Sequence, residues 1–136
     1  MKIYGFRPPY INGYFIVGQV ICGNPTIVQN VNFHIDTGCS ITTISSIDAL
    51  IMDINFSTLN FNIPVSIANG QTMNVAALRN IGLLFEFSNY SIFEKLNQIH
   101  IQPFLPNQQT NTSLLGLDIL SRYTLKYESN FVVLDR

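Results

Sequence analysis

The chain has 136 residues, of which 47% are hydrophobic and 11% charged, and its formal net charge is −1. This length allows one domain with a substantial core, and the absence of a basic cluster argues against a nucleic-acid partner. No apolar run approaches the roughly 20 residues of a membrane helix, and the opening MKIYGFRPPYING lacks the apolar stretch of a signal peptide. We therefore expect a single cytoplasmic domain over residues 1–136, without a membrane partner and with an N-terminal arm over residues 1–12.

The two cysteines, Cys22 and Cys39, are too few for a disulfide framework and do not have the spacing of metal ligands. We interpret both as small, buried, hydrophobic side chains in a reducing compartment, with a disulfide as the less favoured alternative. No metal or other cofactor is expected.

Short β-strand patterns alternate with turn signals along the first half of the chain. Strands are expected over residues 14–22 and 27–35, and this hairpin leads directly into Asp36. Residues 42–44 resume an extended run. A short helical turn is expected over residues 49–52, with Ser45, Ser46 and Asp48 as candidate caps.

The second half also reads mainly as β-structure. Residues 61–68 and 71–78 flank the pair Asn69-Gly70, which is a strong hairpin signal because a type I′ turn needs positive φ at both central positions. Residues 118–123 predict a short helix with Asp118 at its start, where a carboxylate meets free backbone N–H groups. Further strands are expected over residues 81–87, 124–127 and 131–134. The expected class is therefore mainly β, with one short C-terminal helix.

One stretch, FHIDTGCSITTI, places Asp36 at the end of an apolar strand. Aspartate is rarely buried unless it is paired or has a chemical role. Asp-Thr-Gly at 36–38, the Asn-Gly hairpin at 69–70 and LLGLD at 114–118 occur in this order. This arrangement resembles the retropepsin-type aspartic proteases, which are the retroviral proteases and their bacterial and archaeal relatives, over about residues 14–134.

The resemblance implies an all-β fold built on a closed β-barrel, with Asp36 as the catalytic residue and Thr37 and Gly38 supporting its loop. Aspartic proteases use two carboxylates that share one proton: one activates water and the other polarises the scissile carbonyl. Gly38 would allow the sharp turn, and the hydroxyl matching Thr37 bonds to the partner loop in relatives. Because the chain contains a single Asp-Thr-Gly, the resemblance implies a homodimer in which Asp36 meets Asp36 of a second subunit.

The resemblance also indicates substrate-binding residues. Ala68, Asn69 and Gly70 would form a flap over an extended peptide, and Leu114 would face a substrate pocket. His34 stands two residues before the catalytic aspartate, at a position where relatives carry an apolar pocket residue, and strand alternation would place both side chains on one face. The expected activity is an aspartic endopeptidase that cuts peptide or protein substrates between hydrophobic side chains.

Several of these residues have a purely structural alternative. Asp36 could cap a turn, and the Asn-Gly pair could be an ordinary surface hairpin. His34 could be a strand histidine satisfied by a neighbour or by water, and Leu114 a core residue as well as a pocket residue. His100 has no partner in the sequence and is expected at the surface. Asp118 could be a second catalytic acid in the same chain, but its place at a helix start favours a structural carboxylate.

Two positions depart from the retroviral pattern. Retroviral proteases pair an arginine after the second glycine with an aspartate four residues after the catalytic one, and this chain has Leu117 and Ser40 there. Both members are absent together, so no buried charge is left unpaired, and the pattern resembles the cellular relatives. The functional alternatives are a catalytically weak or inactive peptide-binding or dimerisation module with the same fold, and a processing domain that is cut from, or acts on, a larger polyprotein or membrane partner.

Overall fold

The structure is a computed structural model that describes residues 1–23, 26–66, 70–104 and 112–136. Most of the described chain is β-structure, joined by the helices α1 (Ser46–Ile51) and α2 (Leu117–Leu120) and the short 3₁₀ helix η1 (Phe56–Thr58). The strands are β1 (Lys2–Phe6), β2 (Phe15–Cys22), β3 (Ile27–Ile35), β4 (Thr43–Ile44), β5 (Ile63–Ser66), β6 (Thr72–Glu86), β7 (Ser91–Ile101), β8 (Ser113–Leu115), β9 (Thr124–Tyr127) and β10 (Phe131–Asp135).

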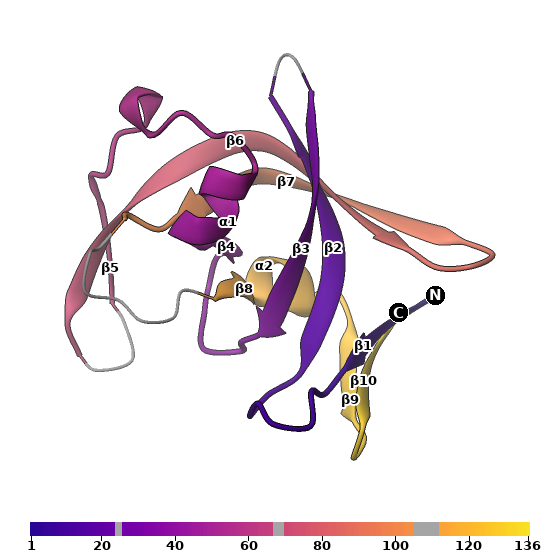
Figure 1. Ribbon diagram of the computed structural model, residues 1–136. Helices are drawn as coiled ribbons and strands as arrows, with labels where there is room; N and C mark the ends of the chain where they lie inside the picture. The colour runs from indigo at the N-terminus through magenta and orange to yellow at the C-terminus, as the bar shows by residue number, and fades with distance from the viewer. Residues whose placement is uncertain (24–25, 67–69, 105–111) are drawn as a thin grey trace.

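Six of these strands close a β-barrel (Figure 1). The hydrogen-bonded order is β6-β7-β4-β8-β3-β2, and β2 pairs back to β6 where Val20 lies opposite Leu83. Closure leaves these strands without the free backbone edges of an open sheet. The expected all-β class and the closed barrel are therefore confirmed.

The barrel interior is filled by large apolar side chains. In β3, Phe33 and Ile35 are buried while Asn32 is exposed, which is the alternation of a strand with one face toward the core. Gly18 of β2 lies against the buried rings: a Cβ there would be 3.1 Å from Phe85 and 3.3 Å from Phe33. Burial of each such aromatic ring contributes about 2 kcal/mol, so this packing helps to fix the strand that leads to Asp36.

The long β6–β7 hairpin differs from the prediction. The sequence predicts separate strands over residues 71–78 and 81–87 and none over residues 91–101, whereas β6 runs unbroken through Asn80 and β7 is the second longest strand. Asn80 has a φ of 58°, and asparagine tolerates this left-handed conformation better than most residues. The prediction missed β7 because two of its exposed positions, Lys95 and Asn97, carry residue types that are uncommon in strands.

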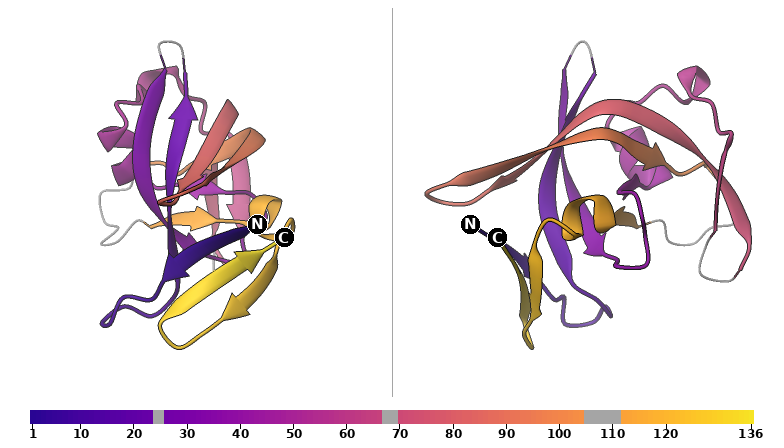
Figure 2. Two further views of the ribbon diagram at one scale, coloured as in Figure 1. Left: turned by 90° about the vertical axis from the view of Figure 1, so that its right-hand side faces the viewer. Right: turned by 180° about the vertical axis from the view of Figure 1, so that it is seen from behind.

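The two ends of the chain form a second part of the sheet (Figure 2). β10 lies between β1 and β9 and pairs with both, which confirms the predicted terminal strand pair β9–β10. The expected N-terminal arm contains β1, in which the buried Ile3 lies opposite Leu134. The amino group of Met1 donates to the carbonyl of Arg136 at 2.8 Å.

The two α-helices begin close to the predicted positions. Ser45 caps α1 by accepting a hydrogen bond from the Asp48 N–H at 3.1 Å, so the predicted helical turn extends to a helix of six residues. Gly116 is the N-cap of α2, and Asp118 lies in the first turn. No helix of the described residues is long and apolar enough to cross a membrane.

The expectation that His100 lies at the surface is wrong. His100 is 9% exposed on β7, and its backbone N–H donates to the Thr42 carbonyl at 3.0 Å, because β4 runs alongside β7. Burial lowers the pKa of His100, and the charge of Asp118 opposes that effect in part. Cys22 is a buried free thiol as expected, whereas Cys39 is a free thiol that is only partly buried, and burial raises the pKa of both.

Candidate active site

The end of β3 carries Asp36 and is held by its two neighbouring segments. The Ile35 N–H donates to the Tyr14 carbonyl at 2.9 Å, and the Asp36 N–H donates to the Leu115 carbonyl at 3.1 Å. β3 therefore stays fixed until the chain turns, and Asp36 emerges half-buried at the end of the barrel.

The turn after β3 fixes one carboxylate oxygen of Asp36. The Gly38 N–H donates to Oδ1 at 2.9 Å, and the Cys39 N–H donates to the Asp36 carbonyl at 3.2 Å. A Cβ at Gly38 would be 3.2 Å from Oδ1, so glycine permits this close approach. The other oxygen, Oδ2, and the exposed Thr37 hydroxyl make no hydrogen bond with the described part of the chain. The turn-capping role therefore occupies one carboxylate oxygen of Asp36 and leaves the other without a hydrogen bond to the described part of the chain.

Backbone hydrogen bonds tie the loop after Asp36 to helix α2. The Leu117 N–H donates to the Cys39 carbonyl at 2.8 Å, and the Asp118 N–H donates to the Ser40 carbonyl at 3.2 Å. A Cβ at Gly116 would be 2.8 Å from the Cys39 carbonyl oxygen, so only glycine allows this contact. In retroviral proteases an ion pair connects the positions of Ser40 and Leu117. In this chain backbone hydrogen bonds connect the same two segments instead.

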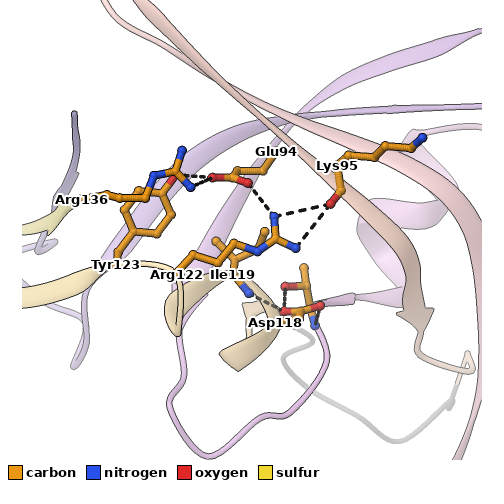
Figure 3. Close-up of polar contacts among 8 residues, drawn as sticks. Glu94, Lys95, Asp118, Ile119, Arg122, Tyr123 and Arg136 are labelled. Atoms are coloured by element: carbon orange, nitrogen blue, oxygen red, sulfur yellow. Dashed lines mark hydrogen bonds and ion pairs between the residues drawn. The ribbon is translucent and has the colours of Figure 1, made fainter.

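Asp118 reinforces this connection with its side chain. The Thr42 N–H donates to Asp118 Oδ2 at 2.9 Å, and the Thr42 hydroxyl donates to Oδ1 at 2.7 Å. Oδ1 also accepts a bond from the Ile119 N–H at 3.0 Å (Figure 3). Since both oxygens are occupied, Asp118 acts as a structural carboxylate, as the helix-start position indicated.

His34 and Leu114 lie side by side where β3 runs parallel to β8. Both are half-buried. The His34 ring packs against Phe15 with centroids 5.1 Å apart, and a Cβ on Gly13 would lie 2.2 Å from its Nε2 atom. The fold therefore brings these two predicted residues side by side, with His34 two positions before Asp36 and its ring packed against Phe15.

The predicted flap is described only in part. Ala68 and Asn69 lie outside the described residues. Gly70 has a φ of +82° and no atom within 4 Å of the position of a Cβ, so the positive φ expected there is confirmed. β5 and β6 form the antiparallel arms of the hairpin, with Ser66 opposite Thr72. In Figure 1 this hairpin and the loop after β3 both extend toward the lower end of the barrel.

A solved structure offers a comparison for this arrangement. The chain is similar to a retropepsin-like aspartic protease from Rickettsia conorii, with a TM-score of 0.64 and 20% identity over 98% of this chain and 89% of that chain. The chain has the retropepsin-like fold. No protein-family model matches the sequence, and none of the curated proteins compared with it matches significantly.

An ionic cluster surrounds the buried Glu94 next to the segment that follows α2, and the sequence did not indicate it (Figure 3). Glu94 of β7 is 5% exposed and accepts hydrogen bonds from Arg122 at 2.5 Å, from Arg136 at 3.1 Å and from the Tyr123 hydroxyl. Burial alone would raise the pKa of Glu94, but these hydrogen bonds and the two arginine charges outweigh it and lower that pKa. The partners lie 28 to 42 positions from Glu94, so no local pattern could indicate them.

Proposed function

We propose that this protein is an aspartic endopeptidase that works as a homodimer, in which Asp36 of each subunit supplies one carboxylate of the catalytic pair. The main support is the position of Asp36 in the single Asp-Thr-Gly of a retropepsin-like fold. Asp118, the other candidate acid, already has both oxygens bound. A second catalytic carboxylate must therefore come from another subunit, and a twofold axis would place Asp36 opposite its own copy.

The geometry of the turn suggests that the two oxygens of each Asp36 carboxylate have different roles. Oδ1 is held by the Gly38 N–H, which leaves Oδ2 to face the partner and the water. Two carboxylates in contact share one proton because like charges so close cannot both ionise. The ionised member takes a proton from the water, which attacks the scissile carbonyl, and the protonated member donates a hydrogen bond to that carbonyl oxygen.

Substrate would lie as an extended peptide between this loop and the β5–β6 hairpin. His34, two residues before Asp36, pairs in register with Leu114, and both would line a pocket for a side chain next to the cleaved bond. Ala68, Asn69 and Gly70 would close over the peptide. No metal or other cofactor has a part in this mechanism, since the two carboxylates activate the water.

Digestion of a peptide library tests the proposal. Wild type, Asp36→Asn and Asp53→Asn would be compared in parallel, with products identified by mass spectrometry. Asp53 is a matched control because it is exposed and has a φ of 60°, which asparagine tolerates. Wild type and Asp53→Asn should cleave the same bonds, while Asp36→Asn should cleave none, since an amide cannot act as the base. Cleavage by Asp36→Asn at the wild-type rate would overturn the proposal. Peptide binding without cleavage by wild type would favour the inactive binding module.

A further inference from the structure

An open pocket of about 500 Å³ lies outside the residues assigned so far. Residues 7–12, in the loop between β1 and β2, form one wall, and Ser129 and Asn130, in the turn between β9 and β10, form the other. Tyr10 is 98% exposed at its rim. The volume falls in the range of about 300–1,000 Å³ that is typical of ligand pockets.

The two walls are held together by specific contacts. The Arg7 N–H donates to the Asn130 carbonyl at 3.1 Å, and the Tyr14 hydroxyl donates to the Glu128 carbonyl at 2.6 Å. The Tyr14 and Tyr127 rings lie 5.0 Å apart between centroids. Two consecutive prolines, at positions 8 and 9, restrict the loop backbone further. The pocket is therefore formed before a ligand arrives, which reduces the entropic cost of binding.

Arg7 is the charged residue of the lining. Its guanidinium lies over the Tyr14 ring, 5.7 Å from the centroid, and has no carboxylate within 4.0 Å among the described residues. A guanidinium presents N–H donors in a planar fork that matches a carboxylate. Asn12, Ser129 and Asn130 also line the pocket and have side chains that carry neutral hydrogen-bond donors. This lining suits a singly charged, planar anion.

The pocket adjoins the end of β3. The loop that forms its wall continues into Gly13, which lies against the His34 ring. The next residue, Tyr14, accepts the hydrogen bond from Ile35, the residue before Asp36. In Figure 1 the β1–β2 loop lies at the same lower end of the barrel as the end of β3. A peptide held at the candidate active site could therefore reach the pocket with a residue away from the cleaved bond.

We propose that this pocket is a secondary subsite that binds a carboxylate of the substrate peptide through Arg7. That the bound peptide is a substrate rests on the endopeptidase proposed above. The carboxylate can come from an acidic side chain or from the free C-terminus of a short peptide, and both offer the same two oxygens to the guanidinium.

Matched peptides test this subsite. Peptides with Asp or Glu at positions away from the cleaved bond would be compared with the same peptides carrying Asn or Gln, each with a free or an amidated C-terminus. Wild type should show a higher kcat/KM for the acidic member, by about fivefold for a solvent-accessible ion pair. Raising the NaCl concentration should reduce this preference because salt screens exposed charges. Comparison of peptides with a free and an amidated C-terminus shows whether the bound carboxylate is the C-terminus or an acidic side chain.

Three variants make the test specific to Arg7. Arg7→Gln should lose the preference while its kcat/KM for neutral peptides stays within about twofold, and Arg7→Lys, which keeps the charge without the fork, should retain part of it. Arg79→Gln is the matched control, since Arg79 is exposed on β6 with no ion pair among the described residues, and it should behave as wild type. Normal cleavage with no acidic preference, or a preference that survives Arg7→Gln, overturns the subsite and leaves the endopeptidase standing.

A binding measurement separates this inference from the proposed function. Fluorescence anisotropy with labelled acidic and neutral peptides would be recorded on the Asp36→Asn protein, which should bind without cleaving. Binding should favour the acidic peptide, and the added Arg7→Gln change should abolish that difference. If wild type cleaves no peptide but this Arg7-dependent binding is present, the endopeptidase is wrong and the carboxylate site stands. Equal binding of both peptides contradicts the site directly.

Discussion

Thr42 binds both carboxylate oxygens of Asp118, through its backbone N–H at 2.9 Å and through its hydroxyl at 2.7 Å. The same hydroxyl accepts a hydrogen bond from the Gly116 N–H at 3.1 Å. Thr42 is fully buried, so these groups have no water to replace a lost partner. One pair of residues thus holds the far end of the loop that begins at Asp36 against helix α2.

Loss of this contact should destabilise the protein and loosen the loop that carries Asp36. We expect Asp118→Ala to lower the free energy of unfolding by about 3 kcal/mol, because it leaves buried donors of Thr42 unsatisfied. Urea unfolding measures the loss, and kcat on a cleaved peptide should fall as well. Asp135→Ala is the control: its 3.6 Å ion pair with Lys126 is partly exposed and should contribute less than about 1 kcal/mol. Equal losses in the two variants would contradict the role given to Asp118.

The buried Glu94 makes stability depend on pH in the acidic range. Its pKa in the folded protein is lowered from 4.5 despite the opposing effect of burial, so its contribution is present above about pH 4.5 and is lost as the pH falls through the folded value. Glu94→Gln should therefore cost about 3 kcal/mol at pH 7. The difference between wild type and variant should shrink toward pH 3 in urea unfolding. A difference that stays constant with pH would mean that the ionised form of Glu94 is not what stabilises the fold.

His100 should add a pH dependence at higher pH. Its pKa in the folded protein is lowered from 6.5, chiefly by burial, so the unfolded chain binds a proton first as the pH falls. Stability should therefore decrease from about pH 7.5 downward until the folded pKa is reached. His100→Gln should remove this part of the slope in urea unfolding between pH 8 and pH 5. An NMR titration of the His100 ring protons gives an independent check, and a midpoint at or above 6.5 would contradict the expectation.

The sequence predicted those parts of the fold that depend on patterns among neighbouring residues. The β2–β3 hairpin shows β-branched alternation, and residues 36–38 form a short motif within which the Gly38 N–H binds the Asp36 carboxylate. The burial of His100 and the ionic partners of Glu94 depend instead on pairings between distant segments, which a single sequence does not encode as a pattern. β7 was not predicted because polar residues occupy exposed positions between the residues that face the core.

Gly70 allows a test of the hairpin that should close over substrate. Its φ of +82° disfavours a β-branched residue, and no neighbour lies within 4 Å of an added Cβ. Gly70→Val should therefore strain the backbone by about 1–2 kcal/mol and lower kcat/KM, with a small change in melting temperature because little core is involved. Gly70→Asn is the matched control, since asparagine tolerates positive φ, and it should retain more activity. A large fall in melting temperature with unchanged kcat/KM would contradict a role in closure.

The dependence of activity on protein concentration decides whether two subunits build one site. A chain with one Asp-Thr-Gly and an Asp118 whose oxygens are occupied offers one candidate for a catalytic carboxylate, so under the proposed function a monomer should be inactive. Well below the dissociation constant of the dimer, the rate should rise with about the square of the total protein concentration.

Mixing experiments give the same test without dilution. Excess Asp36→Asn should inhibit wild type because most wild-type subunits then sit in inactive heterodimers, whereas the same excess of Asp53→Asn should not inhibit. Analytical ultracentrifugation would establish which species is present at each concentration. If the rate per subunit stayed constant where only monomer sediments, both carboxylates would have to lie in one chain. Asp118 would then have to leave Thr42 to act as the second acid, and the homodimeric mechanism would be wrong.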